Sequence, residues 1–154
     1  MENNVVLFYH EWEPWGELGN YYVREMVVDG ITWPAVEHYY QAQKTLDPEY
    51  QKKIHAAATC AEAKALGNSP ECQVRADWDT WKLMAMRKAL FAKFTQHEDL
   101  QELLLSTGDK ILHENSMEDY YWGIGADGTG LSMLGKLLMA LREELRYFKE
   151  QTCK

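Results

Sequence analysis

The sequence predicts an α+β fold that is mostly helical, with a small antiparallel sheet near the N-terminus. Two observations predict it. Short β-rich runs gather in the first 33 residues, and apolar residues recur every three or four positions through most of the remainder. The chain has 154 residues without an internal repeat, a low-complexity segment or a linker. This length predicts one domain over residues 1–154, with its core at about residues 5–149.

Short runs near the N-terminus are typical of strands. Val5–Tyr9 is predicted to be a short buried strand. Tyr21–Val28 and Ile31–Trp33 flank Asp29-Gly30, and an Asp-Gly pair between β-rich runs is a strong hairpin signal. Proline and glycine make Glu11–Gly19 a predicted loop.

Helices are predicted next, each from a start signal. Pro34–Leu46 begins with a proline, which is tolerated in the first turn of a helix. A second helix begins after Asp47 as its N-cap. A third begins at Thr59, whose spacing to Glu62 is that of a capping box, and Gly67 is expected to end it.

A long helix follows the loop Asn68–Ala76. Asp77 can cap it, and its predicted range is about Trp78–Gln96. Glu98–Leu105 is predicted to be a further helix, and Ile111–His113 a short strand. The apolar stripe expected along the long helix is Leu83, Met86, Leu90 and Phe94.

The C-terminal part combines an irregular segment with one amphipathic helix. Asn115–Gly130 is rich in glycine and retains aromatic residues. The last helix is predicted at about Leu131–Lys149. Its expected apolar face is Leu134, Leu137, Leu138, Leu141, Leu145 and Phe148.

Composition and charge disfavour several classes of function. The net charge is −8 and there is no basic run, whereas sequence-independent binding of duplex DNA needs a basic face. The acidic start does not resemble a signal peptide, and no apolar run could span a bilayer. The three cysteines include no CxxC pair, which favours a reducing compartment, cytoplasmic or nuclear. None of the five histidines has HxxxH spacing, so we expect no metal and no cofactor.

The first candidate site is the segment from Glu37 to Lys44. Residues seven apart share a helix face, about 10 Å apart along the axis. Tyr40 and Gln41 lie between them on that face. A carboxylate, a phenol, an amide and an amine could grip a polar ligand. Charged helix faces are usually solvated, however, and spacing alone favours that alternative.

A second candidate site precedes and opens the long helix. Arg75 and Lys82 could bind phosphate, and Trp78 could stack on a planar ring. The alternative is a capping Asp77 beside a core tryptophan, and the sequence alone slightly favours it.

The glycine-rich segment is the third candidate site. Acidic residues stand next to aromatic ones where no regular structure is expected, and such loops often line binding sites. Glycine also lets a ligand approach the backbone closely. Here the pattern favours a function for the stretch Glu114–Gly125 as a whole. The sequence Gly123–Gly125 resembles half of a dinucleotide fingerprint, but no βαβ unit surrounds it.

Together these segments resemble the NADAR family, also called YbiA-like, from about Phe8 to Arg146. The most specific block is Trp33-Pro34 followed by Val36–Lys44, and the segments around Trp78 and Asp119 continue the match. The family pattern has an asparagine where this chain has Ser132 and an aromatic residue where it has Leu18. Those departures fall at the expected edge of the sugar or phosphate pocket, outside the expected catalytic residues.

The resemblance implies an N-glycosidase, which hydrolyses a bond between ribose and nitrogen. It implies two substrate classes, the phosphoribosyl-aminopyrimidine intermediates of riboflavin synthesis and ADP-ribose attached to guanine in a nucleotide or nucleic acid. It also implies functional roles for Glu37, Trp78, Asp119 and Trp122, and a Schiff base between Lys44 and the opened ribose.

These residues allow more than one mechanism and more than one function. The expected catalytic residues are Glu37, Lys44 and Asp119; in a rival mechanism the two carboxyl groups act with water alone. The expected partner is a nucleotide-like small molecule or ADP-ribosylated single-stranded nucleic acid. A non-catalytic module that binds ADP-ribose or NAD and a protein-interaction scaffold are the alternatives. The residues expected to bind substrate are Asn20, Tyr40, Gln41, Arg75, Trp78, Lys82, Trp122 and Gly123.

Overall fold

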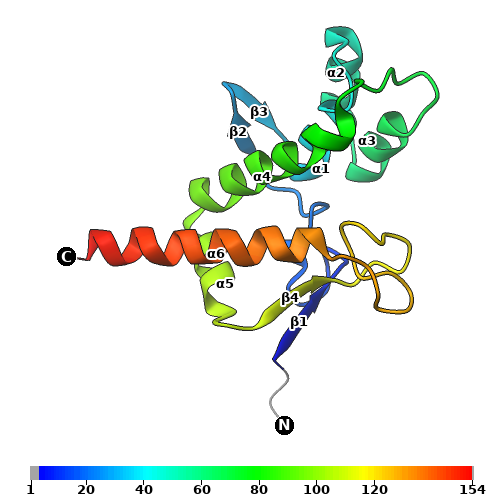
Figure 1. Cartoon of the computed structure of the whole chain (residues 1–154). Helices are drawn as coiled ribbons and strands as arrows, with labels where there is room; N and C mark the ends of the chain where they lie inside the picture. The colour runs from blue at the N-terminus through cyan, green and yellow to red at the C-terminus, as the bar shows by residue number, and fades with distance from the viewer. Residues whose placement is uncertain (1–3, 154) are drawn as a thin grey trace. The chain divides into compact units, whose positions relative to one another are not determined.

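The computed structural model describes residues 4–153, in which the chain folds as two compact units. One unit is Asn20–Gln96, and the other combines Met1–Gly19 with His97–Lys154. Figure 1 shows the elements in chain order by colour. The mostly helical α+β class is confirmed. The sequence has no linker at either junction, so it gave no sign of the division.

The unit at residues 20–96 begins with the predicted hairpin. β2 (Met26–Val28) pairs antiparallel with β3 (Ile31–Trp33). Asp29 and Gly30 both have positive φ, 51° and 80°, as a type I′ turn requires. The Asp-Gly signal therefore placed the small antiparallel sheet correctly.

Helices complete this unit, with α1 at its centre. The side chain of Asp47 accepts a hydrogen bond of 3.0 Å from the N–H of Glu49, and Thr59 accepts one of 3.1 Å from Glu62. Both N-caps are thus confirmed. All seven residues of α1 are buried, and α1 packs against the other three helices. The bounds are α1 (Val36–Ala42), α2 (Pro48–His55), α3 (Cys60–Gly67) and α4 (Trp78–Gln96).

The first helix is shorter than predicted. It ends at Ala42 rather than Leu46. The carbonyl of Lys44 accepts a hydrogen bond of 2.7 Å from the N–H of Arg75, and Thr45 pairs with Val74 in an antiparallel bridge. These contacts with a distant loop draw the chain out of helical geometry, so tertiary pairing sets the end of the helix.

The fourth helix has the predicted range, but one detail of its prediction was wrong. Leu83 is 36% exposed and does not belong to the buried face. Asp77 directly precedes the helix as expected, and its carbonyl accepts a hydrogen bond of 2.8 Å from the N–H of Trp81. Its carboxylate accepts two hydrogen bonds from Arg75. The buried face is formed by Ala85, Met86, Ala89, Leu90, Ala92, Lys93 and Phe94.

The other unit contains a parallel strand pair that the sequence did not predict. β1 (Val5–Phe8) pairs with β4 (Ile111–Glu114), Val5 lying opposite Ile111. Both strands were predicted, but their pairing was not, because no local signal encodes a contact between segments so far apart in the chain. A short 3₁₀ helix, η1 (Gly16–Leu18), follows β1.

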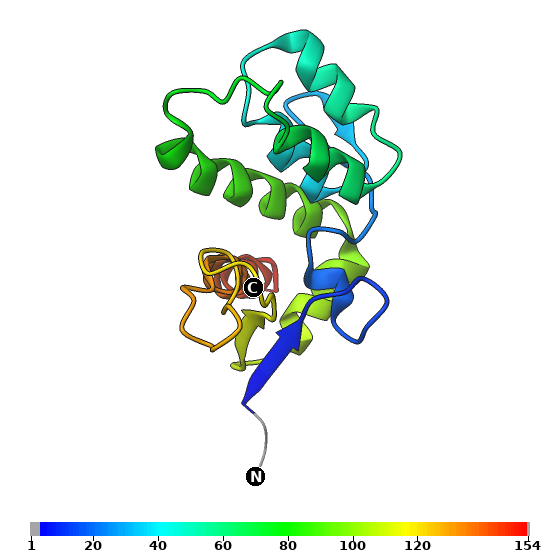
Figure 2. The ribbon, with the colours of Figure 1, turned by 90° about the vertical axis from the view of Figure 1, so that its right-hand side faces the viewer.

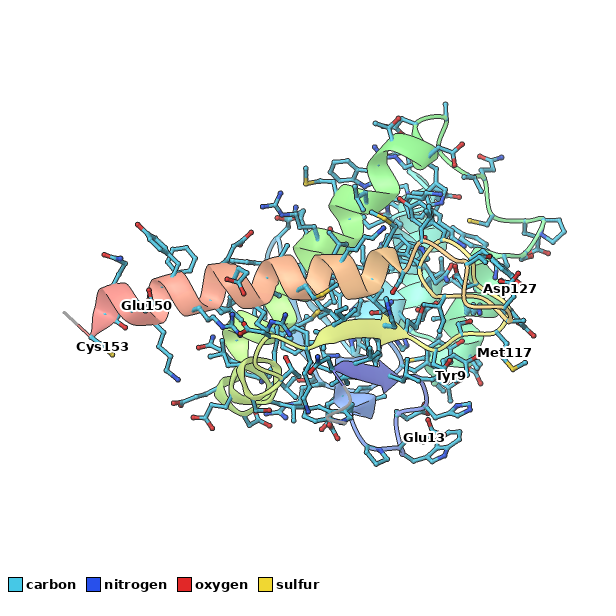
Figure 3. The ribbon with its side chains drawn as sticks, turned by 60° about the horizontal axis from the view of Figure 1, so that its bottom comes forward. Tyr9, Glu13, Met117, Asp127, Glu150 and Cys153 are labelled. Atoms are coloured by element: carbon cyan, nitrogen blue, oxygen red, sulfur yellow. The ribbon has the colours of Figure 1, made fainter. Side chains whose placement is uncertain are left out.

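Helix α6 (Met133–Thr152) packs on β4 and on α5 (Glu98–Ser106) (Figure 2). Phe148 was predicted on its buried face but is 55% exposed. Leu145 is the last buried residue of α6. The turns beyond it, where Tyr147 and Phe148 are exposed, run to Glu150 and Cys153 at the C-terminal end (Figure 3). The buried face is Leu134, Gly135, Leu138, Leu141, Arg142 and Leu145.

Among residues 4–153, no helix is long and apolar enough to cross a membrane.

Candidate functional site

Glu37 is a buried carboxylate in the first turn of α1. It is 6% exposed, and its Oε1 accepts a hydrogen bond of 2.7 Å from Nε2 of Gln41, one turn along the helix. Burying a carboxylate is costly unless hydrogen bonds or charges compensate, and Gln41 supplies one such bond. This helix face is buried, so the solvated alternative that spacing alone favoured does not hold.

Lys44 lies in the turn beyond α1. Its backbone and its side chain contact different parts of the unit. Its carbonyl is bound by the N–H of Arg75. Its Nζ donates a hydrogen bond of 2.8 Å to Oδ1 of Asn68 and lies 5.9 Å from the centre of the Tyr40 ring. The side chain is therefore directed by neighbours and does not extend freely into water.

Burial lowers the pKa of Lys44 from its ordinary value of 10.5, because it disfavours the charged ammonium. The charge of Lys64 lowers this pKa as well, whereas Glu37 and Cys72 oppose the change. Glu37 and Lys44 thus act on each other electrostatically. A lowered pKa enlarges the fraction of neutral amine, the form whose lone pair can attack a carbon atom.

Aromatic side chains stand beside this lysine. The rings of Tyr40 and Trp78 are 5.2 Å apart and tilted by 54°. The guanidinium of Arg75 lies 4.9 Å from the ring centre of Trp81 and donates bonds of 2.6 and 3.0 Å to the carboxylate of Asp77. A phosphate bound by Arg75 would therefore compete with Asp77, which the sequence did not indicate.

Lys82, the other predicted phosphate ligand, lies near the start of α4. Its Nζ is 3.9 Å from a carboxylate oxygen of Asp79, whose side chain is 99% exposed. An ion pair at this distance with a fully solvated partner contributes little, so it does not prevent Lys82 from binding an anion.

Two buried amide oxygens in this unit lack a hydrogen-bond partner among the described residues. They are Oδ1 of Asn20 and Oε1 of Gln41. The amide nitrogen of Asn20 donates to the sulfur of Met86 at 3.5 Å. A buried acceptor without a donor costs about 1–3 kcal/mol, so both oxygens suit a donor supplied by a ligand or by water.

In the other unit, the glycine-rich segment is organised around Asp119. Its Oδ1 accepts hydrogen bonds from the backbone N–H groups of Tyr121 (2.9 Å) and Trp122 (2.7 Å). Ser116 Oγ accepts a bond of 3.2 Å from the N–H of Asp119. This turn fixes one oxygen of the carboxylate. It also holds Trp122, which is 8% exposed and in edge contact with the Tyr121 ring.

Gly123 has a packing role in this segment. An added Cβ would lie 2.9 Å from both Ser116 Cβ and the carbonyl of Asp119, so only glycine fits there. The same segment binds the first turn of α6, because the N–H of Ser132 donates to Gly123 O at 3.0 Å. Ser132 has a left-handed φ of 50° and its Oγ is 2.9 Å from Nδ1 of His113.

The other departure from the family pattern, Leu18, is fully buried in η1.

The predicted site residues divide between the units. Glu37, Tyr40, Gln41 and Lys44 lie together on α1 and the turn after it, with Trp78 against Tyr40. Asn20, Arg75 and Lys82 belong to the same unit, whereas Asp119, Trp122 and Gly123 belong to the other. Asn68 was not among the residues predicted from the sequence. The only sequence feature that points to it is its position directly after Gly67, the expected end of the helix. Among residues 4–153, no cluster of three or more His, Cys, Asp or Glu side chains could hold a metal ion.

Comparisons with known proteins add independent information. Residues 7–146 match the family model described as the NADAR domain. The chain is 46% identical over 145 residues to the N-glycosidase Npun_R5314 of Nostoc punctiforme, covering 92% of this chain and 93% of that protein. It is 41% identical over 145 residues to the N-glycosidase YbiA of Escherichia coli, covering 94% and 91%.

The NMR structure of Escherichia coli YbiA resembles this fold with a TM-score of 0.88, at 41% identity, covering 97% of this chain and 89% of that one. A longer relative is the riboflavin biosynthesis protein VVA0006 of Vibrio vulnificus. It is 41% identical over 141 residues, which are 92% of this chain and 38% of that protein.

Proposed function

Because the chain belongs to the NADAR family and is an N-glycosidase, we propose that it forms a Schiff base at Lys44. Its proposed substrates are ADP-ribosylated guanine, the phosphoribosyl-aminopyrimidine intermediates of riboflavin synthesis, or both. The best support for Lys44 as the nucleophile is its half-buried amine. Burial lowers the pKa of this amine, and the charge of Glu37 acts on it. The longer relative named for riboflavin biosynthesis supports the second substrate class.

The proposed reaction proceeds by exchange of one imine for another. Protonation of the ribose ring oxygen opens the ring and leaves an iminium between the anomeric carbon and the base nitrogen. The neutral amine of Lys44 adds to that carbon, and one lysine proton moves to the base nitrogen. The carbon–nitrogen bond to the base then breaks, which leaves a protonated imine on Lys44. Water hydrolyses this imine to the free sugar aldehyde and the amine.

Glu37 is the proposed carrier of these protons. Glu37 lies on α1, the helix that precedes Lys44. One of its carboxylate oxygens accepts a hydrogen bond from the side-chain amide of Gln41. Positioned acid–base groups of this kind contribute about 10²–10⁴-fold to a rate. Asp119, one of whose oxygens is fixed by two backbone N–H groups, is proposed to orient a sugar hydroxyl or to activate water.

The remaining predicted residues are proposed to bind substrate. Trp78 and Trp122 stack on the base, and each such contact is worth about 1–3 kcal/mol. Lys82 and Arg75 meet phosphate, the latter in competition with Asp77. The amides of Asn20 and Gln41 accept hydrogen bonds from the ligand through their buried oxygens.

Base release tests this proposal directly. The purified full chain is offered each substrate class separately, and the free base is followed by chromatography. We expect release from at least one class, and loss of release in Lys44→Ala. If the wild-type chain binds ADP-ribose but releases base from no ribosylated substrate, it is a non-catalytic binding module. If release survives in Lys44→Ala, water attacks directly.

A further inference from the structure

Asn68 is the hydrogen-bond partner of the Lys44 amine. It is the C-cap residue of α3, with helical backbone angles, and its N–H donates to the carbonyl of Lys64 at 3.0 Å. From this position its side-chain Oδ1 accepts a bond of 2.8 Å from Lys44 Nζ. Its amide therefore projects toward the lysine from a backbone fixed by a helix end.

The packing of α3 on α1 places Asn68. The two helices are in contact, and a Cβ added to Gly67 would collide with the side-chain amide of Gln41. Glycine at this position lets the end of α3 approach α1 closely, and the next residue then reaches Lys44. Gly67 was expected to end this helix, and α3 does end there; its lack of a side chain also allows the close approach to Gln41.

We propose that Asn68 is a positioning residue for the reaction at Lys44. The inference rests on the proposed function. A neutral lysine amine has two N–H bonds and one lone pair, and donation of one N–H to an amide oxygen leaves the lone pair directed elsewhere. The protonated imine that follows retains one N–H, which the same oxygen can accept. Asn68 thus orients the amine before the attack and holds the iminium after it, without forming a covalent bond.

Among the groups around this amine, Asn68 is set apart by its chemistry. Glu37 on α1, Lys64 on α3 and Cys72 in the following loop are the titratable groups whose charges act on Lys44. Each changes its own charge with pH. The amide of Asn68 does not titrate, so it accepts the N–H of the amine or of the iminium at every pH at which the enzyme works.

The first test compares Asn68→Ala with Asn4→Ala, a matched exposed asparagine outside the three candidate segments. A misplaced reactive group can cost about 10²-fold. We expect kcat and the rate of borohydride trapping on Lys44 to fall about 10–100-fold in Asn68→Ala, with KM within about twofold of wild type. Asn4→Ala should behave as wild type. A wild-type kcat in Asn68→Ala would overturn the proposal.

The second test needs no substrate. The pKa of Lys44 is read from the ¹³Cε shift of ¹³C-lysine-labelled full-length protein, with Lys44→Arg identifying the signal. In Asn68→Asp a carboxylate replaces the amide, so we expect that pKa to rise by about one to three pH units. The activity of this variant should recover at alkaline pH, whereas that of Asn68→Ala should not.

The two tests separate the inference from the function on which it rests. An unchanged pKa of Lys44 in Asn68→Asp would overturn the contact, and with it the positioning role, even if the wild-type enzyme forms a Schiff base. A raised pKa with no trapped adduct in wild type would support the contact and refute the imine. If Asn68→Ala does not fold, the nearly isosteric Asn68→Asp still gives both readouts.

Discussion

At the scale of single residues, the proposed chemistry depends on how readily Lys44 loses its proton. The amine attacks only when neutral, and its pKa lies below the ordinary 10.5 because burial disfavours the ammonium. Activity should therefore rise with pH and reach half its maximum below pH 10.5. A kcat/KM profile over pH checks this. A rise in kcat/KM with its midpoint at pH 10.5, the ordinary pKa of lysine, would contradict it.

Glu37 raises the pKa of Lys44 through its negative charge. In Glu37→Gln that charge is lost, so the pKa of Lys44 should fall further and its NMR titration should shift to lower pH. Base release should fall on the order of 10²–10⁴-fold, because the proposed proton carrier is gone. The glutamine oxygen can still accept the bond from Gln41, so the thermal midpoint should change little. An unchanged Lys44 titration would show that the two groups do not interact.

The Asp119 carboxylate accepts hydrogen bonds that shape its loop, and we propose that it also takes part in the reaction. Asp119→Asn keeps an acceptor for the N–H groups of Tyr121 and Trp122 but removes the charge. We expect an unchanged free energy of unfolding and activity reduced on the order of 10²-fold. Asp119→Ala should also lose about 1–3 kcal/mol of stability, because two hydrogen bonds disappear. Equal activity in Asp119→Asn and wild type would leave Asp119 a purely structural role.

At the scale of elements, the contact between α3 and α1 connects packing to the site. Gly67→Ala places a methyl group against the Gln41 side chain, and overpacking of this kind costs about 1–3 kcal/mol. Urea denaturation measures it, with exposed Ala65→Ser on the same helix as a control that should change stability by less than about 0.5 kcal/mol. If Gly67→Ala is as stable as wild type, then α1 and α3 accommodate the added methyl group without loss of stability.

Local signals predicted the elements better than their contacts. The Asp29-Gly30 turn and the Asp47 and Thr59 caps are set within a few residues, and each was confirmed. The early end of α1 depends on the hydrogen bond from the N–H of Arg75 to the carbonyl of Lys44. That pairing across the chain, like the parallel ladder of β1 with β4, has no periodic signature.

The candidate site shows the same limit. Glu37 and Lys44 could be named as candidates because the resemblance to the family lies in the contiguous block that contains them, although their spacing alone favoured a solvated face. Asn68 could not be found, because its proposed role comes from a side-chain contact that only the packing of α3 on α1 creates. The pairing of Arg75 with Asp77 was also missed, because the sequence does not distinguish a capping aspartate from an ion pair.

At the scale of the whole molecule, the family match over residues 7–146 takes residues from both compact units. We propose that the two units serve one enzymatic function as a single domain. Because the family match needs residues of both units, removal of either should abolish base release.

The net charge of −8 bears on the form of any nucleic-acid substrate. Sequence-independent duplex binding derives from neutralised phosphates, and this chain has few cations to offer. We expect no measurable binding of unmodified duplex DNA at physiological salt by fluorescence anisotropy. ADP-ribosylated single strands should still be cleaved if guanine adducts are substrates. Tight duplex binding would point to a different mode of recognition.

In the proposed mechanism, Lys44 bonds covalently to the sugar. Borohydride added during turnover reduces an imine to a stable amine, and peptide mass spectrometry locates the added sugar. We expect one sugar adduct on Lys44, absent in Lys44→Arg and absent without substrate. Continued base release with no adduct on any lysine would contradict it and leave the carboxyl groups and water to carry out the reaction.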